Sequence, residues 1–492
     1  MGSMSGWLLV AGVAFVGQAP AAADNLLEDR WEIAVVGSDR IGFFHTEVRQ
    51  VSASGKPVIH TRQHSQLAIQ RFGQQMKMES ISDYFELPDG RLYATDSQSR
   101  ISNEVTRSKG QLAGAGKFKV TVETKGSKVD QVIDWPATLK GPYAQELSLR
   151  NEPLKPGDSR AFLTFMPEMN VVAERRLKAI DKQMVTLLKR EADLLRVKET
   201  SDKVAIESSL WIDEKGNVQK MSLPLAGLEM TTFRTTKEDA LKEMKIGDTD
   251  IGYQTLVKPD KAIPNAHTAS SVTYRLTFDD AAGAESLPEA SYQRILSRDK
   301  HTLLVKEQSS QPSGTANSAA KPAGPEFLGS NTYIQPDNAK IKKVADEVTA
   351  GAKSEWEKAT RLEKWVADNM TNQDFSIGFA PSSEIIDTRQ GDCTEHAVLL
   401  AALCRAVGIP SRVAMGLVYL ESSQSFGYHM WTEVYIDGDW YAIDGTIGQG
   451  KIGGGHIKIA DGSLKGVDAN STFLPIFKVI GKLKINVEKV TS

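Results

Sequence analysis

The sequence predicts an α+β protein in which a β-rich N-terminal region is followed by a mixed α+β domain. Up to about residue 258, short apolar or β-branched runs alternate with turn signals such as Leu87-Pro88-Asp89-Gly90, a pattern typical of antiparallel strands. Beyond residue 325, apolar residues recur at helical spacing. The chain has 492 residues, of which 40% are hydrophobic, and this length suffices for about three packed domains.

The overall charge and the cysteine count exclude several classes of protein. Lysine and arginine total 59 and acidic residues 62, so the formal net charge is −3 and no basic excess favours binding to nucleic acid. Two cysteines exclude a disulfide framework and a multi-cysteine zinc module. Cys393 and Cys404 fall on one predicted helix, about 16 Å apart at 1.5 Å per residue, beyond the reach of a disulfide. We predict no cofactor and no metal site.

The first 23 residues have the pattern of a secretory signal peptide. An apolar run from Trp7 to Val16 is followed by small residues, with cleavage expected after Ala21 or Ala23. No Lys or Arg precedes the run, and the alternative is a buried N-terminal strand or short helix. The run is too short to span a bilayer, and no other stretch reaches 18 apolar residues, so we expect no stable transmembrane anchor. We therefore expect a periplasmic or secreted protein.

Four segments are predicted after the signal peptide. Residues 24–258 form the β-rich domain, residues 259–308 a further β segment, residues 309–325 a flexible linker and residues 326–492 the α+β domain. The linker is rich in Ser, Pro, Ala and Gly and has almost no apolar bulk to bury. Within the β-rich domain, Glu174–Glu199 contains many helix formers. We interpret it as long strands, because the surrounding pattern is β and helix propensity is a weak prior.

A central buried helix is predicted from Cys393 to Val407, because nearly every position in this segment is apolar. Asp392 can serve as its N-cap with Glu395 three residues later in a capping box, and Gly408 ends it. Cys393 then occupies the first helical position, where the helix dipole favours a thiolate. Asp392 and Glu395 oppose that negative charge, so the thiolate needs a cationic partner.

A β-hairpin is predicted around the two-residue turn Asp437-Gly438. From His429 to Ile436 the side chains alternate as a strand requires. In the register that this turn sets, His429 and Asp444 project from the same face as diagonal neighbours, with β-carbons within about 7–8 Å. A three-residue turn would place Asp444 on the opposite face. The turn chemistry therefore favours the arrangement in which Asp444 can orient His429.

Three blocks of residues, in order along the chain, resemble those of the transglutaminase-like superfamily, a branch of the papain-like fold. The blocks are Gly391-Asp392-Cys393, then Gly408 to Val413 with Gly416, then His429 to Val434 followed by Trp440 to Thr446. The resemblance covers about residues 338–450 and is to the type found in exported bacterial proteins. It implies a papain-like α+β fold for this region.

The resemblance also implies roles for three residues. In that family a cysteine attacks an amide carbonyl and forms a thioester, which passes its acyl group to an amine or to water. Carried over by position, Cys393 is the nucleophile, His429 the general base and acid, and Asp444 the orienting carboxylate. The family usually has proline after the aspartate, where this chain has Gly445. The second oxyanion donor is left unassigned among the upstream residues within reach, which are Gln390, Ser382 and Ser383.

Four other residues in this region each have two interpretations. His396 could join Cys393 as a zinc ligand pair, but a tetrahedral site needs three or four ligands, so we do not favour it. His456 could lie near the cleft, although structural packing is the preferred interpretation. Trp431 could wall the cleft or belong to the core, and Glu433 could hydrogen-bond nearby or lie solvated.

Two functions from different classes fit this sequence. The first is an exported thiol-dependent acyl transferase or hydrolase that acts on peptide or protein amides through the Cys-His-Asp triad. The second is a non-catalytic envelope binding or assembly module, in which the β-rich region engages a cell-envelope partner and the triad is vestigial. The presence of all three triad residues favours the enzyme, since a decaying site would usually lose one of them.

Overall fold

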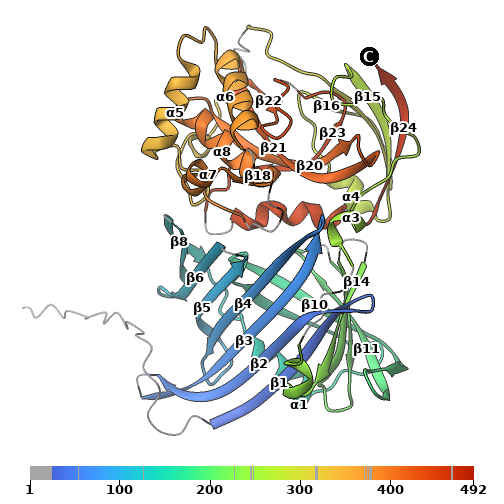
Figure 1. Ribbon diagram of the computed structural model, residues 1–492. Coiled ribbons are helices and arrows are strands. Elements are labelled where there is room, and N and C mark those ends of the chain that lie inside the picture. The colour runs from blue at the N-terminus through green and yellow to red at the C-terminus, as the bar shows by residue number, and fades with distance from the viewer. Residues whose placement is uncertain are drawn as a thin grey trace, which may run out of the picture.

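The computed structural model has two halves, drawn one above the other in Figure 1. It describes residues 25–492 except 54, 103, 126, 205, 226–227, 244–246, 248, 316–319, 371, 374, 376–378, 451 and 467–468. The predicted signal peptide, residues 1–23, lies outside the described residues, and so does part of the predicted linker. No helix in the described part of the chain is long and apolar enough to cross a membrane.

The N-terminal half is one antiparallel sheet of 14 strands that curves around its own interior (Figure 1). The strand order is β8-β7-β6-β5-β4-β3-β2-β1-β14-β13-β12-β11-β10-β9. Strands β1 to β8 and strands β9 to β14 are each neighbours in chain order, and the pairing of β1 with β14 joins these two series into one sheet. The strands are β1 (Asn25–Val36), β2 (Asp39–Ala53), β3 (Lys56–Arg71), β4 (Gln74–Glu86), β5 (Leu92–Ile101), β6 (Glu104–Leu112), β7 (Lys117–Thr124), β8 (Ser127–Asp134), β9 (Ser159–Met166), β10 (Val171–Thr186), β11 (Glu191–Ser201), β12 (Ser208–Ile212), β13 (Val218–Leu225) and β14 (Leu228–Thr235).

The ambiguous stretch Glu174–Glu199 lies in this sheet and is strand, as predicted. It contributes to β10 and β11, which pair antiparallel along almost their whole length. The burial pattern alternates along β10, with Ala173, Leu177 and Ala179 buried. Pairing of both strands inside the sheet therefore outweighs the helix propensity of their Lys, Arg and Glu residues. The predicted turn Leu87-Pro88-Asp89-Gly90 also lies where expected, between β4 and β5.

A second, four-stranded sheet has the order β16-β17-β15-β24. Its strands are β15 (Ser271–Phe278), β16 (Gln293–Arg298), β17 (Thr302–Gln308) and β24 (Leu483–Thr491). The last strand of the chain thus pairs with β15, which comes more than 200 residues earlier. Residues 271–308 and the C-terminal strand therefore belong to one structural layer, drawn at the right of the upper half in Figure 1.

The C-terminal half packs helices against a third sheet, of order β22-β21-β20-β23. The elements of the chain that complete the fold are β18 (Asn372–Gln373), β19 (Gln390–Gly391), β20 (Ser411–Leu420), β21 (Ser425–Ile436), β22 (Asp439–Ile443), β23 (His456–Gly462), α1 (Pro142–Asn151), α2 (Lys237–Ala240), α3 (Ile251–Gln254), α4 (Ala281–Ser286), α5 (Ala339–Thr349), α6 (Glu355–Asn369), α7 (Ser382–Thr388) and α8 (Cys393–Ala406), with 3-10 turns at Pro325–Phe327 and Ala469–Lys478. The predicted α+β class is confirmed.

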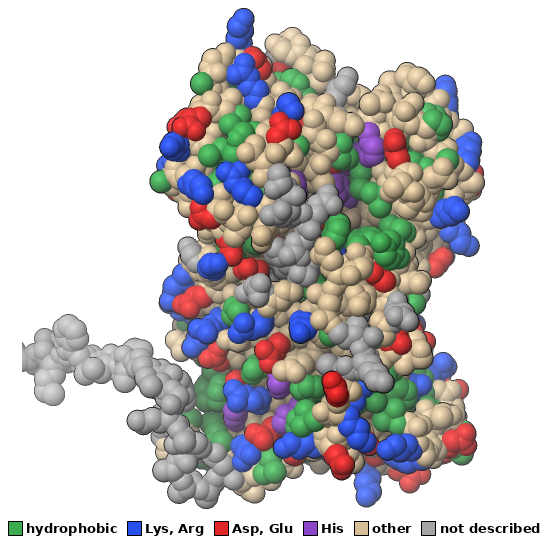
Figure 2. All heavy atoms as spheres, in the orientation of Figure 1, with side chains coloured by type: hydrophobic (Ala, Val, Ile, Leu, Met, Phe, Trp, Pro, Cys, Tyr) green, Lys and Arg blue, Asp and Glu red, His purple; other side chains and the backbone are tan. Residues whose placement is uncertain are grey.

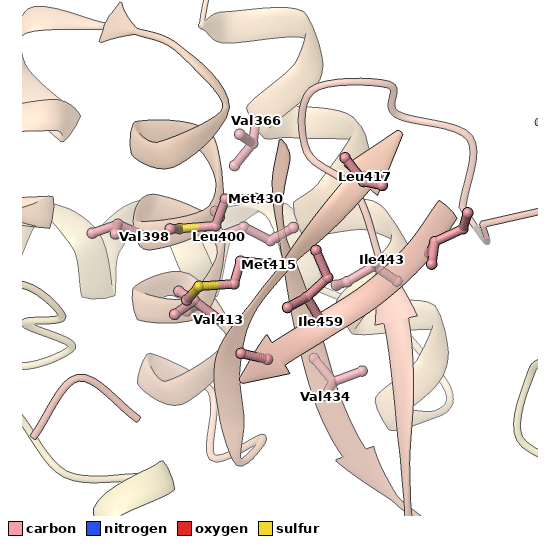
Figure 3. Close-up of a cluster of buried hydrophobic side chains, with 14 of the residues drawn as sticks. Val366, Val398, Leu400, Val413, Met415, Leu417, Met430, Val434, Ile443 and Ile459 are labelled. Carbon is pink, nitrogen blue, oxygen red and sulfur yellow. The ribbon is translucent and has the colours of Figure 1, made fainter. Parts of the chain in front are cut away.

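Helix α8 lies at the centre of the C-terminal core, as its apolar sequence predicts. Val398 and Leu400 of α8 meet Val413 and Met415 of β20 in the apolar cluster drawn in Figure 3. All of these side chains are buried, and burial of each contributes roughly 1.5–3 kcal/mol to folding. This packing fixes α8 against β20 and β21, and so it fixes the start of the helix relative to the sheet.

The visible face of the molecule mixes both signs of charge. Figure 2 shows Lys and Arg side chains interspersed with Asp and Glu side chains over both halves. This distribution agrees with the near-neutral net charge of −3 and gives this face no extended basic surface of the kind that binds nucleic acid.

Candidate active site

The first turn of α8 presents Cys393 at its edge. Asp392 is the N-cap, its side chain accepts a hydrogen bond from the Thr394 N–H at 2.9 Å, and Glu395 completes the predicted capping box. Cys393 is partly exposed, whereas Cys404 is fully buried later in the same helix, and both are free thiols. Burial raises the pKa of the Cys404 thiol far above its ordinary value. Cys393 is therefore the accessible cysteine of the chain.

The predicted hairpin of β21 and β22 carries the histidine and the carboxylate. Asp437 and Gly438 both have positive φ, at 53° and 91°, as a two-residue type I′ turn requires. Ile436 pairs with Asp439 in the register derived from the sequence. As a result His429 Nε2 lies 2.7 Å from Asp444 Oδ2.

A hydrogen bond anchors this hairpin to the cysteine helix. The Thr432 hydroxyl of β21 donates to the Ala397 carbonyl of α8 at 3.0 Å, and both residues are buried. The Cys393 side chain is near enough to the His429 imidazole to raise its pKa. Since Nε2 of His429 faces Asp444, Nδ1 is the ring nitrogen left for the sulfur. The structure thus brings Cys393, His429 and Asp444 together.

The electrostatics of this cluster favour a charged histidine. Burial lowers the pKa of His429, but the charges of Asp444 and Cys393 outweigh it and hold the pKa well above its ordinary value. Burial raises the pKa of Asp444, but the charge of His429 and hydrogen bonds from His429 and His456 outweigh it and hold the pKa well below its ordinary value. Asp444 is therefore an anion at neutral pH, and it stabilises an imidazolium at His429.

His456 is a member of the cluster that the sequence interpretation had assigned to packing. Its Nε2 lies 3.0 Å from Asp444 Oδ2, the same oxygen that His429 contacts. Burial lowers the pKa of His456 to about 4, so the ring is neutral and donates its Nε2–H to the carboxylate. The other carboxylate oxygen, Oδ1, accepts from the Thr446 N–H at 2.8 Å. Asp444 is thus held from three sides.

His429, Asp444 and His456 also form, among the described residues, a group whose ligand atoms all lie within 4.8 Å and could hold a metal ion. The ring nitrogens facing the carboxylate already contact Oδ2 at hydrogen-bond distance. Contacts of this length are those expected when the two histidines and the carboxylate share protons directly through hydrogen bonds.

The other three residues that the sequence left with two interpretations are buried and contact other protein groups. Trp431 is fully buried, stacks on His429 with ring centroids 6.2 Å apart and donates its indole N–H to the Tyr292 hydroxyl. Glu433 is buried and pairs with Lys458 and Arg412. His396 is buried too, with Nδ1 at 2.6 Å from the Asp392 carbonyl, and burial lowers its pKa. His396 is not one of the three residues whose ligand atoms could hold a metal ion.

None of the upstream residues stands out as the second oxyanion donor. Ser382 is buried and its hydroxyl accepts from the Gln335 N–H at 2.8 Å, while the Ser383 N–H donates to the Gln335 side chain. Gln390 is exposed in β19. The role stays unassigned.

Residues 342–445 match the family model of the transglutaminase-like superfamily. This match covers Cys393, His429 and Asp444, and the C-terminal half therefore contains a transglutaminase-like domain. A search of curated proteins finds no match.

Several solved structures are similar to parts of this chain, all at low identity and low TM-score. A β-barrel-like protein of a domain of unknown function from Brucella abortus is 14% identical, covers 44% of this chain and 98% of its own, and has a TM-score of 0.33. A candidate cysteine protease from Cytophaga hutchinsonii is 21% identical, with coverages of 45% and 86% and a TM-score of 0.30. The periplasmic domain of TgpA from Pseudomonas aeruginosa, bound to ethylmercury, is 16% identical, with coverages of 37% and 91% and a TM-score of 0.22. These likenesses assign no function to this chain.

Proposed function

We propose that this protein is an exported thiol-dependent acyl transferase or hydrolase that acts on peptide or protein amides, with Cys393, His429 and Asp444 as its catalytic residues. The observation that carries the proposal is the position of His429 between a partly exposed thiol and a buried carboxylate, with Nε2 at 2.7 Å from Asp444. The match of this segment to the transglutaminase-like superfamily supports the same chemistry.

In the proposed reaction, the Cys393 thiol gives its proton to His429 and the sulfur attacks the amide carbonyl carbon. The carbon–nitrogen bond then breaks, the imidazolium protonates the leaving amine, and a thioester remains. Water or a primary amine attacks the thioester while His429 accepts its proton and returns it to the departing sulfur. The backbone N–H of Cys393 supplies one hydrogen bond to the oxyanion. Asp444 holds the imidazole and its charge throughout.

The proposed site of action is the periplasm or the cell exterior. This part of the proposal is supported by the apolar run and small residues of the first 23 positions. A cell-envelope partner for the N-terminal sheet belongs to the same proposal, and the substrate would be a peptide or a protein.

The two cysteines provide a matched test, because they lie on one helix and differ in exposure. Cys393→Ala should lower turnover of amide-donor peptides by at least about 10⁴-fold, a loss typical of removing a nucleophile. Cys404→Ala should leave turnover within about threefold. Products are identified by mass spectrometry with and without a primary amine, which separates transfer from hydrolysis.

Alkylation provides a test that needs no substrate. Cys393 should react with iodoacetamide well below pH 8 while buried Cys404 stays protected, and His429→Ala should slow the reaction because the cation beside the sulfur is lost. A Cys393 that labels no faster than free cysteine, with or without His429, would contradict the enzyme and favour the binding module.

A further inference from the structure

The tip of the β3–β4 hairpin reaches from the N-terminal sheet to the first turn of α8. Arg71, the last residue of β3, places Nη1 2.7 Å from Oδ2 of Asp392, the residue directly before Cys393. The Asp392 side chain is 2% exposed and that of Arg71 29%. Two residues more than 300 positions apart therefore form an ion pair beside the candidate nucleophile, and one of them belongs to the other half of the molecule.

Several contacts hold this hairpin tip in place. Phe72 and Gly73 both have positive φ, at 50° and 78°, and Phe72 is a residue type that rarely adopts this conformation. The Asp250 carboxylate accepts from the N–H groups of both residues, at 2.9 and 2.7 Å. The Phe72 ring packs against Tyr253 and Phe375. The Asp250 hydrogen bonds and the packing of the Phe72 ring together stabilise this unfavourable backbone conformation. They therefore fix the position of Arg71 at the end of its strand.

The C-terminal half also holds the hairpin through Phe375. Its backbone N–H donates to the Gln74 side chain at 2.7 Å, and its ring lies under the Arg71 guanidinium, 5.7 Å from the centroid. The guanidinium therefore has an aromatic face on one side and the Asp392 carboxylate on another. Arginine suits this position better than lysine does, because its planar guanidinium can stack on an aromatic ring and pair with a carboxylate at the same time.

The charges around Cys393 make this contact consequential. Burial, together with the neighbouring Asp392 charge, raises the pKa of Glu395 well above its ordinary value. His396 is neutral because burial lowers its pKa. His429 and Asp444 form a pair of opposite charge. The Asp392 carboxylate lies at the start of the helix, directly before Cys393, and Arg71 is the cation in contact with it.

We propose that the N-terminal sheet completes the active site, with Arg71 as a positioning residue that neutralises Asp392 and so favours the thiolate of Cys393. The inference rests on the proposed function. It explains how a cysteine preceded by an acidic N-cap can be activated: the capping carboxylate keeps its bond to the helix N–H, while a cation from the other half of the chain balances its charge.

The test is the pH dependence of Cys393 alkylation by iodoacetamide in the full-length protein. Arg71→Gln should raise the pH of half-maximal alkylation by about one unit and slow the reaction at pH 7 by up to about tenfold, as expected when one nearby charge is uncovered. Arg71→Lys retains the charge and should restore most of the rate. High salt should shrink the difference between the Gln variant and the wild type.

The chain offers a matched control for loss of an ion pair between the halves. Lys125 Nζ lies 2.6 Å from Glu384 Oε1, so Lys125→Gln removes such a pair without touching Asp392. It should leave the alkylation profile unchanged. An unshifted profile in Arg71→Gln, or an equal shift in Lys125→Gln, would overturn the inference.

Asp392→Asn separates the charge effect from a loss of structure, because asparagine is also a good N-cap. In that background Arg71→Gln should cause no further shift, since no carboxylate is left to neutralise. A full shift in the double variant would overturn the proposed route through Asp392. Wild-type Cys393 that reacts only as free cysteine does would contradict the proposed function itself, whereas a reactive wild type with an unshifted Arg71→Gln contradicts the inference alone.

Discussion

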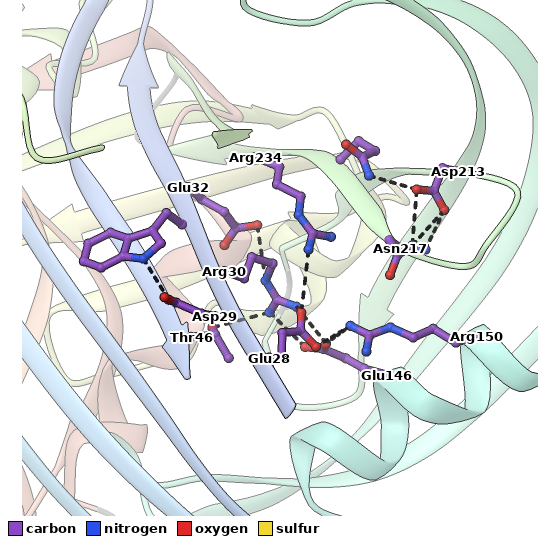
Figure 4. Close-up of polar contacts among 12 residues, drawn as sticks. Glu28, Asp29, Arg30, Glu32, Thr46, Glu146, Arg150, Asp213, Asn217 and Arg234 are labelled. Carbon is purple, nitrogen blue, oxygen red and sulfur yellow. Dashed lines mark hydrogen bonds and ion pairs between the residues drawn. The ribbon is translucent and has the colours of Figure 1, made fainter. Parts of the chain in front are cut away.

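The two halves of the molecule both bury charged groups, but they use them differently. In the N-terminal sheet, Arg30 of β1 contacts Glu146 of α1 at 2.7 Å and Glu28 at 2.9 Å, and Arg150 contacts the same two carboxylates (Figure 4). These groups tie helix α1 to the inner face of the sheet beside a cavity of about 380 Å³. In the C-terminal half, His429 and Asp444 form an equally close pair.

The difference between the clusters lies in what else their members touch. The N-terminal cluster is a closed set, in which cations and carboxylates mainly contact one another. Burial lowers the pKa of Arg30, but the charge of Glu146 outweighs it and raises the pKa above its ordinary value, so the cation is held permanently. His429 instead has a second ring nitrogen, which is available to a partly exposed thiol. Burial of charge therefore does not by itself indicate a reactive site, whereas a titratable group between a carboxylate and an accessible thiol is the arrangement on which the proposed function rests.

Among the variants that test this comparison, Arg30→Met is expected to change the free energy of unfolding most. Removing the cation leaves Glu28 and Glu146 short of a partner in a partly buried site, which should lower the free energy of unfolding by about 3 kcal/mol. Urea unfolding measures this loss, and alkylation of Cys393 in the folded variant should be unchanged. Arg91→Met is the matched control, because Arg91 and Asp89 form a largely exposed ion pair worth less than about 1 kcal/mol. A variant of Arg30 that stays fully stable would show that the cluster does not have the structural role assigned to it.

The local chemistry of the site could be read from the sequence, because short-range rules determine it. The capping box at Asp392 follows from three neighbouring positions, and the Asp437-Gly438 turn sets a register that brings His429 to Asp444. The strands of Glu174–Glu199 were recognised from their surroundings. The capping box and the hairpin register each depend only on residues that lie close together along the chain.

The parts that could not be predicted depend on the order of strands and the docking of the two halves. His456 reaches Asp444 because β23 pairs with β20, on the far side of β20 from β21 and β22. Sequence spacing gives no information about that order. Arg71 meets Asp392 only after the 14-stranded sheet has formed and its hairpin has docked. A histidine at the start of a strand beside Gly455 was the one signal present for His456, and it fits packing equally well.

Glu363 is a buried acid beside the candidate active site, and it can be asked whether this acid contributes to stability or to the proposed reaction. Burial raises the pKa of Glu363 to about 8, and its Oε1 accepts from the Asp444 N–H at 3.0 Å. Because the folded-state pKa exceeds the ordinary value of 4.5, the carboxyl contributes fully to stability below about pH 4.5, and this contribution is lost as the pH rises through 8. A shift of this size amounts to at most about 4 kcal/mol between pH 5 and pH 8, part of which relaxation recovers.

Glu363→Gln mimics the protonated acid at every pH. Between pH 5 and pH 8, the wild type should therefore lose about 2 kcal/mol of unfolding free energy more than the variant does. Glu355→Gln, an exposed position on the same helix, should follow the wild type. Parallel stability curves for the wild type and Glu363→Gln would place the proton elsewhere. A loss of turnover in Glu363→Gln without a change in stability would instead make this acid part of the chemistry.

His456 gives the smallest expected effect and the sharpest test of the cluster as a chemical unit. His456→Phe keeps the volume of the ring but removes the N–H donated to Asp444, a bond to a charged group worth about 1.5 kcal/mol, so kcat should fall about tenfold while KM changes little. His267→Phe is the matched control, because His267 packs against His456 but bonds to the Tyr419 carbonyl. His456→Gln, which can donate to Asp444, should recover part of the rate. If both Phe variants lose activity equally, His456 only fills space, and Asp444 needs no third support to hold His429.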